Sequence, residues 1–352
     1  MTENLRSLRL QGFALMIAAA ASFCASAIAA AQDSVAEFYR GKTIHFVVGA
    51  AAGGGYDVAA RTLALHMSRH IPGNPSMVVE NMPGASGLVM ANSFYNKASR
   101  DGLSLGMFSN NLPFEPKLAT LGRNAQFDLS RMFWIGSPVQ DPLLLWVLTS
   151  KARTFEDVRK SKVLIGATVA GGDTYVLPLI LREALGAQFE MITGYKGQSE
   201  IYLAAERGEV HGMTGGVSVL YGTNANWVRE GKAVGLVQFG LDRTEQAKDV
   251  PTAIELSTSA ADKALFRFIA LKFRMARPIA LPPETPADRV KALRAAFDAT
   301  MKDAQFQQDA ARAGLEPNPV DGDGIAELIR EIETTPDEVS GRLKQILAKV
   351  GN

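Results

Sequence analysis

The chain has 352 residues, 47% of them hydrophobic and 21% charged, so it can bury a core and is not a disordered chain. Lys and Arg number 37 against 36 Asp and Glu, and no run of basic residues offers the clustered positive field that a nucleic-acid binder needs. A single cysteine excludes a disulfide scaffold, an iron–sulfur protein and a cysteine-rich zinc site.

Residues 1–31 have the pattern of a secretory signal peptide. Arg6 and Arg9 precede a short apolar stretch, and small residues follow it up to Ala31. The apolar stretch falls short of the roughly 20 residues that span a bilayer, which favours cleavage, after Ala29 or Ala31, over a membrane anchor. We therefore expect an exported, periplasmic protein whose mature chain contains no cysteine.

The first block after this segment alternates strands, glycine-rich turns and helices. The first strand runs into Gly53-Gly54-Gly55-Tyr56-Asp57, which opens a helix, and the third ends at Asn110 and Asn111. This alternation predicts an α/β domain with a mostly parallel sheet. The expected strands cover residues 44–48, 77–80 and 103–108.

A second block repeats this organisation from about residue 140. Thr154 and Asp157 have the spacing of a capping box at the start of a helix. A strand then leads to the turn 168–174, and a later strand leads to Thr214-Gly215-Gly216. Two amphipathic helical stretches are expected at the C-terminal end, at residues 287–312 and 322–349.

Each block thus places a glycine-rich turn at the start of a helix. The first N–H groups of a helix have no partner within it, and the helix dipole puts partial positive charge there. Glycine lets an anion approach the backbone and permits a positive φ. Two such turns, one in each domain, could hold one anion from both sides, although either turn alone is more simply a chain reversal.

The sequence gives little support to nucleotide binding, metal binding or catalysis. A dinucleotide fingerprint would need glycine or alanine where Val58 stands, and Gly41-Lys42-Thr43 has no glycine five residues before it, so we expect no nucleotide and no cofactor. His66 and His70 share a helix face but are interpreted as surface histidines rather than metal ligands. Asp57 remains a candidate general base beside a helix N-terminus.

At these residues the sequence resembles the solute-binding proteins of tripartite tricarboxylate transporters, the Bug-type receptors. The resemblance covers roughly residues 37–318 and is carried by five segments in the expected order. These are Gly53 to Asp57, Val79-Glu80-Asn81-Met82-Pro83-Gly84-Ala85-Ser86-Gly87, Tyr195-Lys196-Gly197, Asp249-Val250-Pro251-Thr252 and Pro282 to Pro286. One departure is Tyr56, which stands where the family often has Thr or Ser.

The resemblance implies an α/β, two-lobed periplasmic binding-protein fold of type II-like form, with two crossovers between the lobes. Lobe 1 is expected to comprise residues 32–139 plus 261–352, and lobe 2 residues 140–260, with crossovers near 138–142 and 255–275. The implied function is that of a monomeric, non-enzymatic receptor. It would bind a small carboxylate-containing organic compound and deliver it to the membrane permease subunits of a tripartite tricarboxylate transporter.

The resemblance also implies a ligand held between the lobes, largely by backbone N–H groups. Lys196 could steer an anion or simply be solvated. The expected ligand-binding residues lie in the two glycine loops, in the loops after two other strands, and at Lys196: Ala51, Ala52, Gly53, Gly54, Gly55, Tyr56, Asp57, Asn110, Asn111, Ala170, Gly171, Gly172, Asp173, Thr174, Lys196, Thr214, Gly215 and Gly216.

Two other functions stay open at this point. A periplasmic hydrolase or lyase would use Asp57 as base and a glycine loop as oxyanion site. A ligand-loaded partner of a sensor kinase would need the same closed form as a transport receptor. If backbone N–H groups hold the ligand, valine at Gly54 or Gly171 should abolish binding, whereas Lys196→Ala should be tolerated.

Overall fold

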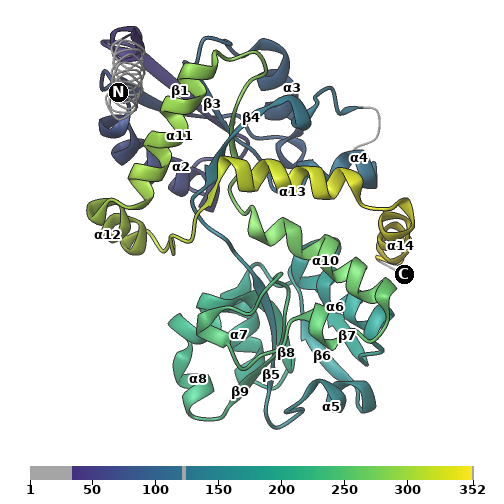
Figure 1. The fold of residues 1–352 in the computed structure, drawn as a ribbon. Coiled ribbons are helices and arrows are strands. Elements are labelled where there is room, and N and C mark those ends of the chain that lie inside the picture. Colours follow the sequence, from purple (N-terminus) through teal and green to yellow (C-terminus); the bar gives the residue numbers. More distant parts are fainter. Residues whose placement is uncertain (1–33, 121–123, 351–352) are drawn as a thin grey trace, which may run out of the picture.

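The computed structural model describes residues 34–120 and 124–350, so the expected signal peptide lies outside the described residues. Within them the chain forms two β-sheets, each covered by helices, which lie in two lobes stacked one above the other (Figure 1). This confirms the α/β, two-lobed fold. Every helix in the described part of the chain is too short or too polar to traverse a lipid bilayer.

The first sheet has six strands in the order β11-β4-β10-β3-β1-β2. The apolar strand β1 lies between β2 and β3 and pairs with both in parallel, while β10 runs antiparallel to β3 and β4. Its strands are β1 (Thr43–Val48), β2 (Ser76–Asn81), β3 (Ser104–Met107), β4 (Phe133–Ser137), β10 (Ile279–Leu281) and β11 (Val320–Asp321). The helices of this part are 34–39, α2 (Gly55–Met67), α3 (Leu88–Lys97), α4 (Glu115–Leu118), α11 (Ala287–Met301), α12 (Ala304–Arg312) and α13 (Gly322–Thr334).

The second sheet has five strands in the order β7-β6-β8-β5-β9. Here β6 pairs with β7 and β8 in parallel, and β5 runs antiparallel to β8 and β9. Its strands are β5 (Leu143–Leu148), β6 (Val163–Gly166), β7 (Phe189–Ile192), β8 (Gly212–Gly216) and β9 (Ala233–Gln238). The helices are α5 (Phe155–Lys160), which begins with the expected capping box, α6 (Asp173–Leu185), α7 (Gln198–Glu206), α8 (Ala225–Arg229) and α9 (Ala253–Leu256).

This topology brings the carboxyl ends of the parallel strands of both sheets to the junction between the lobes. The first crossover, residues 138–142, leaves the carboxyl end of β4 and enters β5. Because β4 is parallel to β1 and β3, and β5 is antiparallel to β6 and β8, both sets of carboxyl ends meet this crossover. The loops after such strand ends are where open α/β sheets bind ligands.

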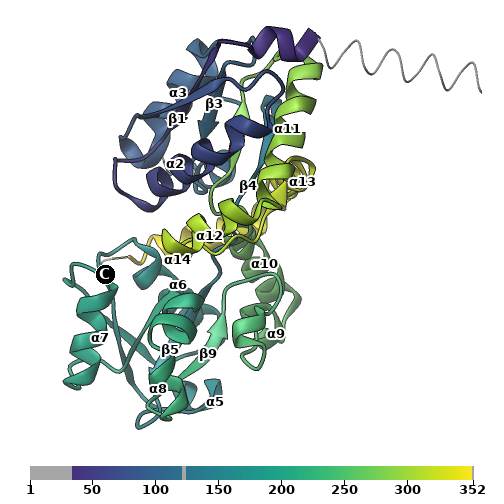
Figure 2. The same ribbon diagram turned by 90° about the vertical axis from the view of Figure 1, so that its left-hand side faces the viewer.

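Two helices connect the lobes. The second crossover, expected near 255–275, consists mostly of helix α10 (Ala260–Arg274), after which the chain enters β10. Helix α14 (Asp337–Leu347) contacts α4 of the first part, α6 of the second and α10. A single buried apolar cluster therefore runs from Trp134 through Leu271 and Leu343 to Leu179. Figure 2 shows α10 and α14 between the two lobes. Where the moving lobes begin and end stays a prediction.

Candidate functional site

The first glycine loop folds around the carboxylate of Asp57. Gly53 has a φ of +79°, and Gly54 is the N-cap of α2 without any side-chain cap. Asp57 is buried and accepts hydrogen bonds from the Gly53 N–H at 2.8 Å, from Arg61 at 3.0 Å and from Asn81 Nδ2 at 2.9 Å. Asp57 therefore holds the loop in shape, and the N–H of Gly53 is already in use.

The same contacts change how Asp57 titrates. The hydrogen bond from Arg61, with help from Gly53 and Asn81, lowers the pKa of Asp57 to about 2, although its burial acts in the opposite direction. A general base works best with a pKa near the operating pH and within reach of a substrate proton. A buried carboxylate with three donors and this pKa does not meet either condition, which argues against the hydrolase or lyase interpretation.

Tyr56 points from the first loop towards the second crossover. Its hydroxyl donates to Asn110 Oδ1 at 3.2 Å and accepts from the Asn110 N–H at 3.2 Å. Burial raises the pKa of Tyr56, so its phenol stays protonated. The guanidinium of Arg277 lies 4.4 Å from the centre of the Tyr56 ring, in cation–π geometry, and its Nη2 is 3.9 Å from Asp141. Tyr56 and Asn110, both expected site residues, thus form one cluster with Arg277.

The second glycine loop opens α6 in a different way. Gly171 has a φ of +90° and Gly172 is the N-cap. The loop is closed by Thr174, whose Oγ1 accepts from the Thr168 N–H at 3.0 Å. Asp173, the first residue of α6, directs both carboxylate oxygens to Lys272 Nζ on α10, at 2.7 and 2.8 Å.

Several expected residues of both lobes line one cavity of about 420 Å³. Asn111 contributes from the first lobe, and Gly171, Gly172 and Asp173 from the second. Ser86 and Lys272, which were not among the expected site residues, complete its polar end. The Lys272 carbonyl also accepts a hydrogen bond from Asn110 Nδ2 at 3.2 Å, so Lys272 joins Asp173 of the second loop to the cluster of Tyr56 and Asn110.

The remaining expected residues are more scattered. Ala51, Ala52 and Ala170 are exposed on the loops, as is Lys196, whose backbone N–H donates to Glu200 at 2.5 Å. The others lie around the carboxyl end of β8. Thr214 is fully buried, a Cβ on Gly215 would lie 2.7 Å from Gln198 Oε1, and one on Gly216 would lie 3.8 Å from Asp141. No contact brings Lys196 to the loops within the described residues, and its role stays a prediction.

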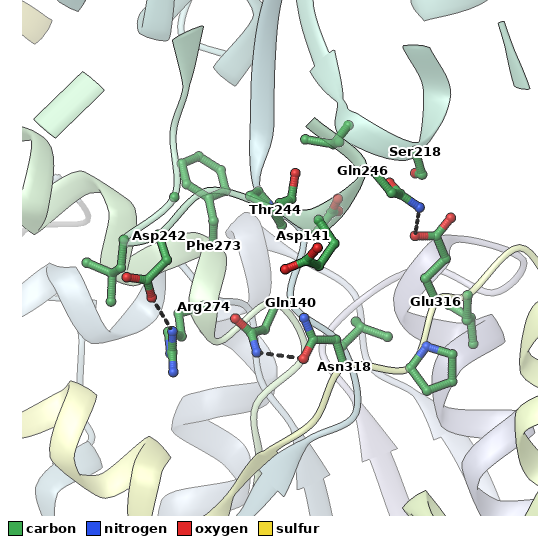
Figure 3. Close-up of a pocket in the computed structure, with 18 of the residues that line it drawn as sticks. Gln140, Asp141, Ser218, Asp242, Thr244, Gln246, Phe273, Arg274, Glu316 and Asn318 are labelled. Carbon is green, nitrogen blue, oxygen red and sulfur yellow. Dashed lines mark hydrogen bonds and ion pairs between the residues drawn. The ribbon is translucent and has the colours of Figure 1, made fainter. Parts of the chain in front are cut away.

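A second cavity between the lobes, of about 540 Å³, lies on the β9 and β11 side of the crossovers. Its polar side chains pair with one another, as Figure 3 shows for Arg274 with Asp242, Gln140 with Asn318, and Gln246 with Glu316. Its charged lining residues are Asp141, Asp242, Glu245, Glu316, Arg243, Arg274 and Arg277, and none of the expected ligand-binding residues lines it. We therefore place the candidate site at the two glycine loops.

His66 and His70 contact acidic residues near the C-terminal part of the first lobe. His66, expected at the surface, is buried, and its Nε2 lies 3.0 Å from Asp309 on α12, while His70 contacts Asp303 at 2.9 Å. Helix α12 packs against α2, which is why this helix face is covered. No group of three or more His, Cys, Asp and Glu side chains in the described ranges is placed to hold a metal ion.

Lys272 and Arg277 are the cations that sequence reasoning missed. Both lie where α10 leads into β10, and this segment reaches the two loops only through the fold. One signal was available in the sequence. Four basic residues fall between 267 and 277, at the end of the stretch expected to form the second crossover, where side chains face the junction of the lobes.

The chain is similar to a known protein family and to several proteins of that family. The model of the tripartite tricarboxylate transporter family receptor matches residues 59–340. A Cupriavidus necator protein described as "UPF0065 protein in gbd 5'region" is 26% identical over 325 residues, which cover 90% of this chain and 91% of that protein.

Two solved structures show the same fold. A TctC solute-binding protein from Polaromonas, without ligand, is 20% identical and has a TM-score of 0.69, with 89% of this chain and all of that chain covered. MatC from Rhodopseudomonas palustris with bound malate is 20% identical, with a TM-score of 0.55 and coverage of 87% and 99%. Since the family model matches most of its length, the chain belongs to the tripartite tricarboxylate transporter family of receptors.

Proposed function

We propose that this protein is a periplasmic receptor that binds a small carboxylate between its lobes and delivers it to the membrane permease subunits of a tripartite transporter. The observation that carries the proposal is the pair of glycine loops, one from each lobe, which open α2 and α6 at the junction of the lobes. The malate in the related MatC structure supports the choice of a carboxylate as ligand.

The charges at the junction suit an anion. The first N–H groups of α2 and α6 have no partner within their helices and carry the positive end of the helix dipole. Asp173 would repel a carboxylate at α6, but the Lys272 ammonium neutralises it. Closure of the lobes would remove water from the ligand, which strengthens hydrogen bonds from these N–H groups to a carboxylate.

Calorimetry with sodium malate, hexanoate and benzoate tests the proposal. We expect at least one acid to bind, and Lys272→Met to weaken it at least tenfold, because Asp173 is then left uncompensated beside the ligand. Lys196→Met is the matched control and should change the affinity less than twofold, since the Lys196 side chain is exposed. The double variant Lys272→Met with Asp173→Asn should regain part of the affinity.

Binding of none of the acids, together with recovery of a non-carboxylate molecule from the denatured native protein by mass spectrometry, would contradict the proposal. Delivery is tested separately, by uptake of the bound acid in host cells with and without this chain. Unchanged uptake would show that the protein does not deliver this acid to a transporter.

A further inference from the structure

The cavity at the second glycine loop has two chemically different ends. Its polar end holds Lys272, Asp173 and the backbone of Gly171 and Gly172. The rest of its wall is mostly apolar and is built by α4, α6, α10 and α14, which come together beside the junction of the lobes (Figure 1). The apolar wall includes Phe114, Leu118, Val176, Ile180, Ile269 and Leu347.

Both lobes and both connecting helices contribute to this wall. Phe114, which lines the cavity, packs edge-to-face on Phe268 of α10, with ring centres 5.0 Å apart. Glu115 is the acidic residue within the apolar part, and it is buried and accepts a hydrogen bond from Thr120. This acidic side chain offers no partner to a second carboxylate on a ligand.

We propose that the ligand is an amphipathic monocarboxylate, whose carboxylate lies at Lys272 and the N-terminus of α6 and whose apolar chain fills the cavity between α4, α6, α10 and α14. This inference rests on the proposed carboxylate function and specifies the ligand class. The volume of about 420 Å³ lies within the range of small-molecule sites. A second carboxylate in the apolar part would lose its hydration without gaining a cationic partner.

The affinity should therefore increase with the length of the apolar chain. Each buried methylene contributes about 0.8 kcal/mol, which corresponds to about a fourfold lower Kd. We would measure Kd by calorimetry for butanoate, hexanoate and octanoate, with succinate and adipate as the dicarboxylates of matched length. We expect the Kd to fall stepwise from butanoate to hexanoate to octanoate. Succinate should bind more weakly than butanoate, and adipate more weakly than hexanoate.

Val176→Phe tests whether the apolar chain of the ligand occupies this cavity. Val176 is half-buried on α6 and lines the cavity, so a phenyl ring there should fill part of the space. We expect this variant to bind butanoate with nearly the affinity of the parent. It should no longer bind octanoate more tightly than butanoate. Val78→Phe is the matched control, because Val78 is 46% exposed on the edge strand β2, and it should keep the whole series unchanged.

The outcomes separate this inference from the function on which it rests. If succinate or adipate binds more tightly than the monocarboxylates, the ligand class is wrong while the carboxylate receptor stands. If Val176→Phe binds octanoate more tightly than butanoate by the same factor as the parent does, the apolar chain of the ligand lies outside this cavity. If no carboxylate binds, the proposed function itself fails. Circular dichroism of both variants establishes that they are folded.

Discussion

The two glycine loops have similar sequences but use their aspartates in opposite ways. In the first, Gly54-Gly55-Tyr56-Asp57, the carboxylate of Asp57 turns back into its own loop and is buried. In the second, Gly171-Gly172-Asp173-Thr174, the carboxylate of Asp173 faces away from its loop and meets Lys272 on α10. The loop of the second lobe is closed by the Thr174 hydroxyl instead.

The difference follows from where the aspartate falls in the first helical turn. Asp57 is the third residue of α2, a position from which a side chain reaches back to the N–H groups before the helix. Asp173 is the first residue of α6, so it projects from the helix end towards neighbouring elements. A glycine pair followed by aspartate therefore indicates a helix start, but the exact offset decides whether the acid shapes the loop or faces the site.

The largest expected contrast is in stability. Asp57→Ala removes the acceptor for three donors, including the Gly53 N–H of the loop, and should lower the free energy of unfolding by about 2–3 kcal/mol. Asp173→Ala removes a partly exposed ion pair and should cost about 1 kcal/mol or less. Urea denaturation of both variants measures the contrast, and equal losses would show that Asp57 does not hold its loop.

The contrast should also depend on pH. The folded-state pKa of Asp57 is about 2, below the unfolded value of about 3.9, so the unfolded chain binds the proton more readily. The contribution of Asp57 to stability is thus complete above about pH 5 and is lost as the pH falls towards 2. Urea curves of the parent and of Asp57→Asn should converge over that interval. A constant gap would mean that the carboxylate is not the stabilising group.

Replacing a glycine with valine should also destabilise the two loops to different extents, by less than the aspartate substitutions do. A positive φ disfavours valine, and the two glycines differ in this respect, because Gly54 has a φ of −80° whereas Gly171 has +90°. Gly171→Val should therefore lower stability by about 1–2 kcal/mol, and Gly54→Val by less than about 0.5 kcal/mol. Thermal unfolding monitored by circular dichroism checks the ranking. Similar losses at the two positions would show that the backbone at Gly171 relaxes.

Much of the fold could be predicted from local pattern. The apolar runs of 44–48 and 143–148 and the capping box at Thr154 are local signals, and each corresponds to an element of the structure. The glycine turns predicted two helix starts correctly. The burial of His66 against α12 could not be predicted, because its partner Asp309 lies 243 residues away.

The sequence by itself determined the alternation of strands and helices, the resemblance to a receptor family and the two glycine loops, since each depends on residues close together in the chain. Only the tertiary structure decided the environment of these loops. Lys272 meets Asp173, and Arg277 meets Tyr56, across separations of 99 and 221 residues. Charge pairing and burial depend on distance in space, and the order of strands in the two sheets sets that distance.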